Sequence, residues 1–254
     1  MGTRLNSTER RVLYLYGVTQ LRPATPIVQV GVDLQSAVEA IGSEGVTCWV
    51  SRVSAEEFEN SLAKNMENLD WLATASVAHQ RAIQAISQHS DILPARFGTV
   101  FRDERSLADH IQKHLKQISR DLKRVKDADE WGIKIFESAP TPNPVPKVSS
   151  GKEYLMAKAA LLPKKQPAQI PAEELKDFEG ALSDIAEESA PAGRISSGQR
   201  GLLFQTSLLI KRANRQRLET ALKKFSREWA ETRRIECTGP WPPYSFVSQD
   251  SKPQ

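Results

Sequence analysis

The sequence predicts an α+β protein, in which antiparallel sheets pack against amphipathic helices. Short runs of β-branched and aromatic residues, such as residues 11–18, are typical of strands. They alternate with helical segments, the clearest of which spans residues 103–125. Its apolar residues recur every three or four positions along one helix face: Leu107, Ile111, Leu115, Ile118, Leu122 and Val125. The alternation of strands and helices along the chain favours a sheet on one side and helices on the other. This is a ferredoxin-like arrangement with additions.

The first half of the chain supplies an N-terminal α+β domain over residues 1–137. Its expected elements, in chain order, are a strand at 11–18, two strands within 35–53 joined by a turn at 42–45, a short helix, a longer helix at about 66–89, extended structure at 91–101, the helix at 103–125 and a strand at 130–137. The strand at 130–137 closes this domain.

The two helices between the strands have recognisable signals. Ser54 and Glu57 have the spacing of a capping box, which predicts the start of the short helix. The longer helix carries a stripe of mostly apolar residues that we expect to face the core: Leu69, Leu72, Ala73, Ser76, Val77, Ile83 and Ile86.

Residues 138–149 predict a linker, because alternating prolines favour extended polyproline II structure: Pro140, Pro142, Pro144 and Pro146. A smaller α+β domain over residues 150–254 follows. Its expected elements are a helix from 151, a helix after Pro171, a strand pair within 193–212 turned at 198–201, a helix at 214–233 and a strand at 234–238. The residues of the 214–233 helix that we expect to face inward are Leu218, Ala221, Leu222, Phe225 and Trp229.

The chain then runs into "GPWPPYSF", residues 239–246. Proline ends regular structure, and large aromatic side chains favour burial. We therefore expect a rigid extended tail whose rings dock onto the second domain: Trp241, Tyr244 and Phe246.

Composition narrows the class of protein. Thirty-five basic residues against 31 acidic ones give a net charge of +4, which does not require a nucleic-acid partner. No apolar run is long enough to span a membrane, and the N-terminus lacks the pattern of a secretory signal. Cys48 and Cys237 match no metal or redox motif, so we expect two reduced, strand-borne thiols in a cytoplasmic protein.

Catalytic signals are scarce, so we expect neither an enzyme nor a cofactor. The sequence contains no Walker loop, GxGxxG, GxSxG or HExxH motif. His110 and His114 are four residues apart on a helix but have no evident third ligand, so we interpret them as surface histidines without a metal. His79 and His89 offer nothing stronger.

A nucleic-acid-binding α+β module is the alternative function. The helix that begins near residue 214 is basic, but glutamates dilute its charge and indicate a solvated face. The aromatic residues that could stack on bases have apolar neighbours, and we expect them to be buried: Tyr14, Tyr16 and Trp49.

The segment "RFGTVF", residues 96–101, is the candidate partner-binding site. Gly98 allows close backbone approach, and the side chains that could contact a partner are Arg96, Phe97, Val100 and Phe101. The alternative is structural: the arginine pairs with a carboxylate, and the apolar side chains fill the domain core.

Six motifs, taken in order, resemble the gas vesicle GvpF/GvpL family over almost the whole chain. They are "YLYGV" at the first strand, "VSRVSAEEF" at 50–58, "ILPARFGTVF" at 92–101, "EWGIKIFE" at 130–137, "SGKEYLMAK" at 150–158 and "GPWPPYSFV" at 239–247. The resemblance implies two α+β domains without enzymatic activity. It also implies a cytoplasmic assembly factor or minor component of gas vesicles.

The resemblance further implies a partner, the major shell protein GvpA, which is small, apolar and prone to self-association. A chaperone-like protein that binds its exposed surface would limit aggregation while the vesicle nucleates. Sheet edges and apolar surface of the N-terminal domain are suited to that contact.

Overall fold

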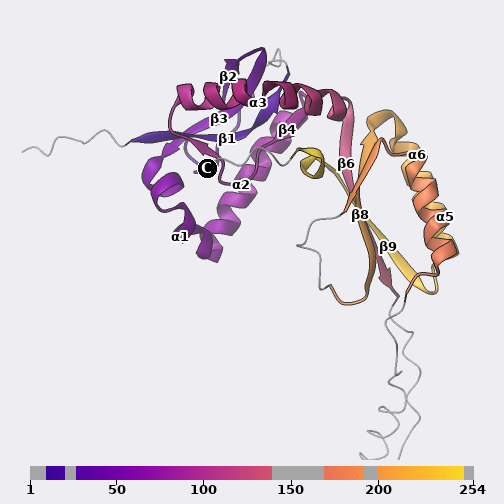
Figure 1. Ribbon diagram of the computed structural model, residues 1–254. Coiled ribbons are helices and arrows are strands. Elements are labelled where there is room, and N and C mark those ends of the chain that lie inside the picture. The colour runs from indigo at the N-terminus through magenta and orange to yellow at the C-terminus, as the bar shows by residue number, and fades with distance from the viewer. Residues whose placement is uncertain (1–9, 21–26, 139–168, 192–198, 249–254) are drawn as a thin grey trace, which may run out of the picture. The chain divides into compact units, whose positions relative to one another are not determined.

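The computed structural model describes residues 10–20, 27–138, 169–191 and 199–248 (Figure 1). These residues form a mixed α+β structure with two separate antiparallel sheets, which confirms the predicted fold class. The chain divides into two compact units. The first unit consists of the described residues up to Glu130 and those from Gly239 onward. The second unit consists of the described residues within Trp131–Thr238.

The first unit is built on a five-stranded sheet. Its strands are β1 (Arg11–Thr19), β2 (Glu39–Ser43), β3 (Val46–Ser54), β4 (Ile92–Pro94) and β5 (Val100–Phe101). The spatial order is β2-β3-β1-β4, and β5 also pairs with β1. The β2–β3 hairpin turns at Glu44 and Gly45, whose φ angles of 49° and 80° suit a two-residue turn. The strand pair and turn expected within residues 35–53 are therefore confirmed.

Helices cover both faces of this sheet, not one face as we expected. Tyr14 packs against His79 of α2 (Leu69–Ser87), with ring centroids 5.6 Å apart. The neighbouring residue in β1 is paired with Phe101, whose ring lies 5.2 Å from His110 of α3 (Glu104–Val125). Since successive side chains of a strand point to opposite faces, α2 and α3 lie on opposite sides of the sheet (Figure 1). The reason is that β1 is apolar on both faces, and both need cover.

The segment before α2 differs from the expected capping box. Residues Glu56–Asn60 form a single π-helical turn, η1, and its N-cap Ala55 has no capping side chain. A short helix, α1 (Leu62–Glu67), follows and ends at Asn68. The Asn68 side chain accepts hydrogen bonds from the backbone N–H groups of the first α2 residues, at 3.1 and 3.2 Å. The predicted 66–89 helix is therefore split at Asn68, because an asparagine cap starts a new helix there.

The inward face of α2 is also rotated from the expected stripe. Its buried residues are Ala75, Ala78, His79, Ala82, Ile83 and Ile86. Leu69 and Val77, which we expected inside, are 78% and 49% exposed. The alanines allow α2 to lie close to the Tyr14 and Tyr16 rings, so the larger apolar side chains at the start of the helix turn outward.

In its described residues, the second unit has a four-stranded sheet and two α-helices. Its elements are β6 (Ala128–Glu137), α5 (Ala172–Ser183), β7 (Glu188–Pro191), β8 (Leu202–Lys211), the 3-10 turn η3 (Arg212–Asn214), α6 (Arg215–Glu228) and β9 (Arg233–Trp241), with the strand order β7-β8-β6-β9. Figure 1 shows α5 and α6 side by side on one face of the sheet. As predicted, α6 turns Leu218, Leu222 and Phe225 inward, and Trp229, at its C-cap, is buried with them.

The division into units corrects the expected domain boundaries. Strand β6, which we expected to close the N-terminal domain, is an inner strand of the second sheet. Its apolar face belongs there because Trp131, Ile133 and Ile135 pack against Phe178 and the α6 side chains. The proline-rich linker beyond residue 138, the helix expected from 151 and the strand expected at 193–197 lie outside the described residues. The partner of β8 is instead β7.

Two sequence expectations concern the environment of the whole chain. Cys48, in β3, is buried, and Cys237, in β9, is exposed, and both thiols are free as expected. Within the described ranges, every helix is too short or too polar to cross a lipid bilayer.

Candidate functional site

An aromatic cluster joins β1, η1, α2 and the loop between β4 and β5 in the first unit. Its members are Tyr14 and Tyr16 of β1, Phe58 of η1, Trp71 and His79 of α2, and Phe97 of the loop between β4 and β5. The ring centroids lie 5.2–6.2 Å apart, within the range of favourable aromatic pairs. Burial of Tyr14, Tyr16 and Trp49 is confirmed, so these rings provide no stacking platform for bases.

His79 lies at the centre of this cluster, between two tyrosine hydroxyl groups. Its Nδ1 is 3.0 Å from the Tyr14 hydroxyl, and its Nε2 is 3.3 Å from the hydroxyl of Tyr244 in the tail. Burial lowers the pKa of His79 to about 4, although a hydrogen bond with the Ala95 backbone acts in the opposite direction. Burial raises the pKa of both tyrosines. The group is therefore neutral at pH 7, and its arrangement suits packing and tail attachment.

Two buried carboxylates hold the tail. The N–H and Oγ of Ser245 donate to Glu130 at 2.8 and 2.6 Å, and those of Ser248 donate to Asp121 at 3.1 Å each. Arg124 donates to the Phe246 carbonyl and pairs with Asp121 at 3.1 Å. Because Asp121 and Glu130 are almost inaccessible to solvent, their hydrogen bonds to the tail are costly to break.

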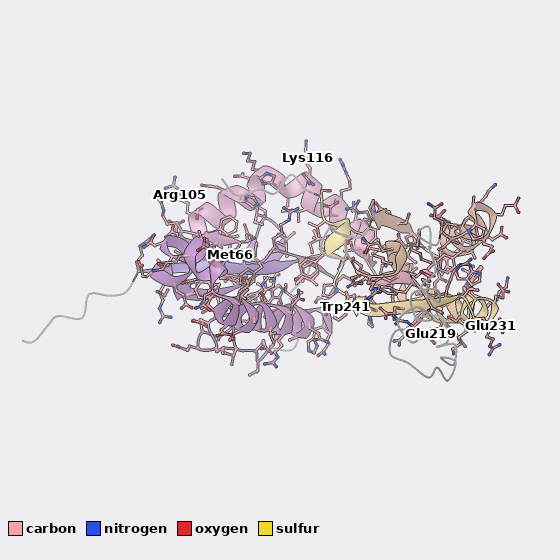
Figure 2. All side chains as sticks on the ribbon, turned by 90° about the horizontal axis from the view of Figure 1, so that it is seen from below. Met66, Arg105, Lys116, Glu219, Glu231 and Trp241 are labelled. Atoms are coloured by element: carbon pink, nitrogen blue, oxygen red, sulfur yellow. The ribbon has the colours of Figure 1, made fainter. Side chains whose placement is uncertain are left out.

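The tail thus docks on the first unit, which corrects the expectation that it docks on the second. Phe246, in the short 3-10 turn η4 (Tyr244–Phe246), is buried, and Tyr244 packs against the core that contains Tyr14. Trp241, marked in Figure 2, is 51% exposed, so the expectation of a buried ring is wrong for this residue. The physical reason is that the partners of the tail, Asp121 and Glu130, lie in the first unit.

The loop of residues 95–99 is fixed to β1 by its backbone. Ala95 N–H donates to the Tyr16 carbonyl at 2.8 Å, and Gly98 N–H donates to the Tyr14 hydroxyl at 3.0 Å. Gly98 has a φ of 81°, which explains the need for glycine. Phe97 and Val100 are half-buried against the core, and Phe101 is buried. Of the four expected contact residues, Arg96 alone is exposed, and the core-filling alternative describes Phe101.

An exposed apolar face on α2 is the surface that sequence reasoning missed. Leu69, Ala73 and Val77 are all exposed and lie four residues apart, so they share one side of the helix, which we call the α2 apolar face. Of the charged residues in the helix, Asp70 lies beside this line, and the exposed Arg81, four residues after Val77, ends it. The sequence signal was visible, since all three residues were in the expected stripe, but we assigned that stripe to the core.

The two helix histidines, His110 and His114, lie next to each other on α3. The His110 and His114 rings are 4.3 Å apart, and His114 Nδ1 is 2.8 Å from the His110 carbonyl. Burial, with His114 and Lys113 nearby, lowers the pKa of His110. In the part of the chain that the structure describes, no group of three or more possible ligands gathers.

Comparison with known proteins decides the family. The family model described as "Gas vesicle synthesis protein GvpL/GvpF" matches residues 12–248. The chain belongs to the GvpL/GvpF family. It is 28% identical to gas vesicle protein L of Streptomyces sp. (strain CB03234), with 93% of each chain covered. It is 23% identical to gas vesicle protein F1 of Halobacterium salinarum, with 67% of each covered.

Solved GvpF structures share this fold. The GvpF crystal structure from Anabaena sp. PCC7120 has a TM-score of 0.66 at 17% identity, covering 96% of this chain and 99% of that one. The GvpF structure from Microcystis aeruginosa has a TM-score of 0.66 at 18% identity, covering 93% and 99%. Membership of this family supports a gas-vesicle-related function and interactions with other gas vesicle proteins.

Proposed function

We propose that this protein is a gas vesicle assembly factor or minor vesicle component that binds the shell protein GvpA through the α2 apolar face. The observation that carries the proposal is the exposure of this face. Amphipathic surface helices normally turn charged residues to solvent, whereas Leu69 is 78% exposed and Val77 is 49% exposed. Exposed apolar side chains at helical spacing are suited to a helix or strand of an apolar partner.

The uncharged character of the face matches the chemistry of the partner. The resemblance to GvpF and GvpL implies that the partner is a small, apolar subunit prone to self-association. Asp70 lies beside the face, and the exposed Arg81 follows Val77 at its end, so these opposite charges can orient a docked subunit without placing a charge on the line from Leu69 to Val77. Covering the apolar surface of a free subunit would limit its aggregation in the cytoplasm before it joins the growing vesicle.

The rest of the first unit supports a binding role more than a catalytic one. The aromatic cluster is neutral, with Tyr14, Tyr16 and His79 buried, and Asp121 and Glu130 hold the tail. These contacts give a rigid base for α2, because Tyr14, His79 and Tyr244 connect the helix, the sheet and the tail. Of the expected contacts, Arg96 is the exposed residue that we retain as a second point of contact.

A capture assay tests this surface. Replacing Leu69 and Val77 together (Leu69→Asp/Val77→Asp) should reduce GvpA capture from a co-expression lysate by at least about tenfold, since two desolvated apolar contacts are replaced by carboxylates. Both positions are exposed, so the variant should keep the thermal stability of the parent protein.

The matched control is Val28→Asp/Val30→Asp, which adds the same charges at two exposed valines outside the α2 apolar face. Val28 is 97% exposed and Val30 is 47% exposed. We expect this control to capture GvpA like the parent. Equal capture by both double variants would show that α2 is not the binding surface, and no capture by the parent protein would contradict the proposed function itself.

A further inference from the structure

The outer side of α3 carries a line of positive charge. Five exposed cations lie on the side of the helix opposite to its buried residues: Arg105, Lys113, Lys116, Arg120 and Lys123. We call these five residues the basic ridge. It extends for about 27 Å at 1.5 Å per residue. Figure 2 shows Arg105 and Lys116 at two points along α3. One exposed carboxylate, Asp109, interrupts the line.

The cations of the basic ridge are exposed, with Asp109 as the nearby carboxylate on the same side of the helix. Among the described residues, its five cations form no ion pair. Like charges three or four positions apart disfavour a helix, and the last four ridge residues have this spacing. The basic helix α6 differs, because Arg215 pairs with Glu219 at 3.0 Å and Lys224 with Glu228 at 3.8 Å. The charge of α3 is therefore available to a separate acidic surface.

The second unit presents such a surface. Residues 172–188, which run from α5 to the first residue of β7, contain a single lysine, Lys176, and seven carboxylates: Glu173, Glu174, Asp177, Glu179, Asp184, Glu187 and Glu188. Glu174 pairs with Arg233 at 2.5 Å. Glu173 and Asp177, one helical turn apart, are both exposed and form no ion pair within the described part of the chain. We call residues 172–188 the acidic segment.

We propose that the basic ridge of one molecule docks on the acidic segment of a second copy of this chain. Charge complementarity between two helices of the same protein carries this inference. The contact joins different surfaces of the two copies. In a pair of molecules, one copy therefore keeps a free acidic segment and the other keeps a free basic ridge. Such a head-to-tail contact extends into a chain of molecules or closes into a ring. This self-association is independent of the proposed contact between α2 and the shell protein.

Other occupants fit the ridge less well. Single-stranded nucleic acid is usually held by aromatic rings beside the cations, and the ridge has none. A helix that binds a bilayer surface inserts its apolar side, but the apolar residues of α3, such as Leu107 and Ile111, are buried against the sheet. A second copy, by contrast, supplies the acidic segment, in which the exposed Glu173 and Asp177 lie one turn apart on the helix α5.

Sedimentation equilibrium of the full chain tests the proposal. The average mass should rise with protein concentration at about 0.1 M salt and return to the monomer value at about 1 M salt, where the screening length falls from ~10 to ~3 Å. Lys116→Glu/Arg120→Glu and Glu173→Lys/Asp177→Lys should each weaken self-association by at least about tenfold, because each creates like-charge contacts. An equimolar mixture of the two variants should associate again, since every ridge then meets a segment of opposite charge.

The matched control is Lys223→Glu/Arg227→Glu on α6, which reverses two exposed cations at the same spacing in a different helix. It should self-associate like the parent protein. A parent protein that stays monomeric at about 0.1 M salt, or variants whose mixture fails to associate, would overturn the proposal. Binding of a labelled DNA duplex to the ridge without self-association would assign the face to nucleic acid and would also overturn it.

Discussion

Replacing Phe246 with alanine should lower the free energy of unfolding of the first unit by about 3–5 kcal/mol, the range for truncating a buried phenylalanine. The Phe246 side chain is 2% exposed, and its carbonyl accepts a hydrogen bond from Arg124. Because Ser245 and Ser248 on either side bind buried carboxylates, the tail cannot easily shift to fill the cavity. Urea unfolding, followed by far-ultraviolet circular dichroism, measures the loss.

The matched control for this prediction is Trp241→Ala in the same tail. Its ring is 51% exposed, so the loss should stay below about 1 kcal/mol. The sequence alone predicted that the Trp241 and Phe246 rings would both be buried. If Trp241→Ala costs as much as Phe246→Ala, the described docking of the tail is wrong.

Acidification should destabilise the first unit through His79. Burial holds its pKa at about 4 in the folded protein, below the ordinary value of 6.5. The unfolded chain therefore binds the proton first as the pH falls. Above pH 6.5, protonation of His79 does not reduce the free energy of unfolding. Between pH 6.5 and pH 4, the free energy of unfolding falls by about 3 kcal/mol in total. Roughly 2 kcal/mol of this should be lost by about pH 5.

The His79→Phe variant separates this effect from other titrations. Phenylalanine keeps a ring between Tyr14 and Tyr244 but cannot be protonated, so the steep loss of stability between neutral pH and about pH 5 should largely disappear. The smaller contribution of His110, whose pKa is also lowered, should remain. His89→Phe is the control for the added phenylalanine, since His89 is exposed and lies outside the aromatic cluster. Identical pH profiles for the parent and His79→Phe would contradict the neutral, buried His79.

Most secondary structure could be predicted from the sequence, because local patterns determine it. The spacing of apolar residues located α3, and the strand-forming runs located β1, β3 and β6. The assignment of elements to sheets could not be predicted in the same way. Strand β6 follows α3 directly, yet it pairs with β8 and β9, more than 60 residues further along the chain. Local patterns carry no information about such long-range pairing.

The candidate site was harder to predict because burial depends on tertiary contacts. The expected stripe on α2 included the residues of the α2 apolar face, but two sides of that helix are apolar enough to face the core. The side of α2 that carries the small alanines faces the core, because these side chains fit beneath Tyr14 and Tyr16. Asp121 and Glu130 gave no signal in the sequence, since their serine partners are 127 and 115 residues away.

Site-specific photo-crosslinking tests the central claim most directly, that the α2 apolar face holds the shell subunit. A photoreactive amino acid placed at position 77 in the full chain should form an adduct of one chain with GvpA, because Val77 is half exposed in the middle of that face. The same group at position 28, on an exposed valine outside the face, should form none. Adducts from position 28 but none from position 77 would contradict the account.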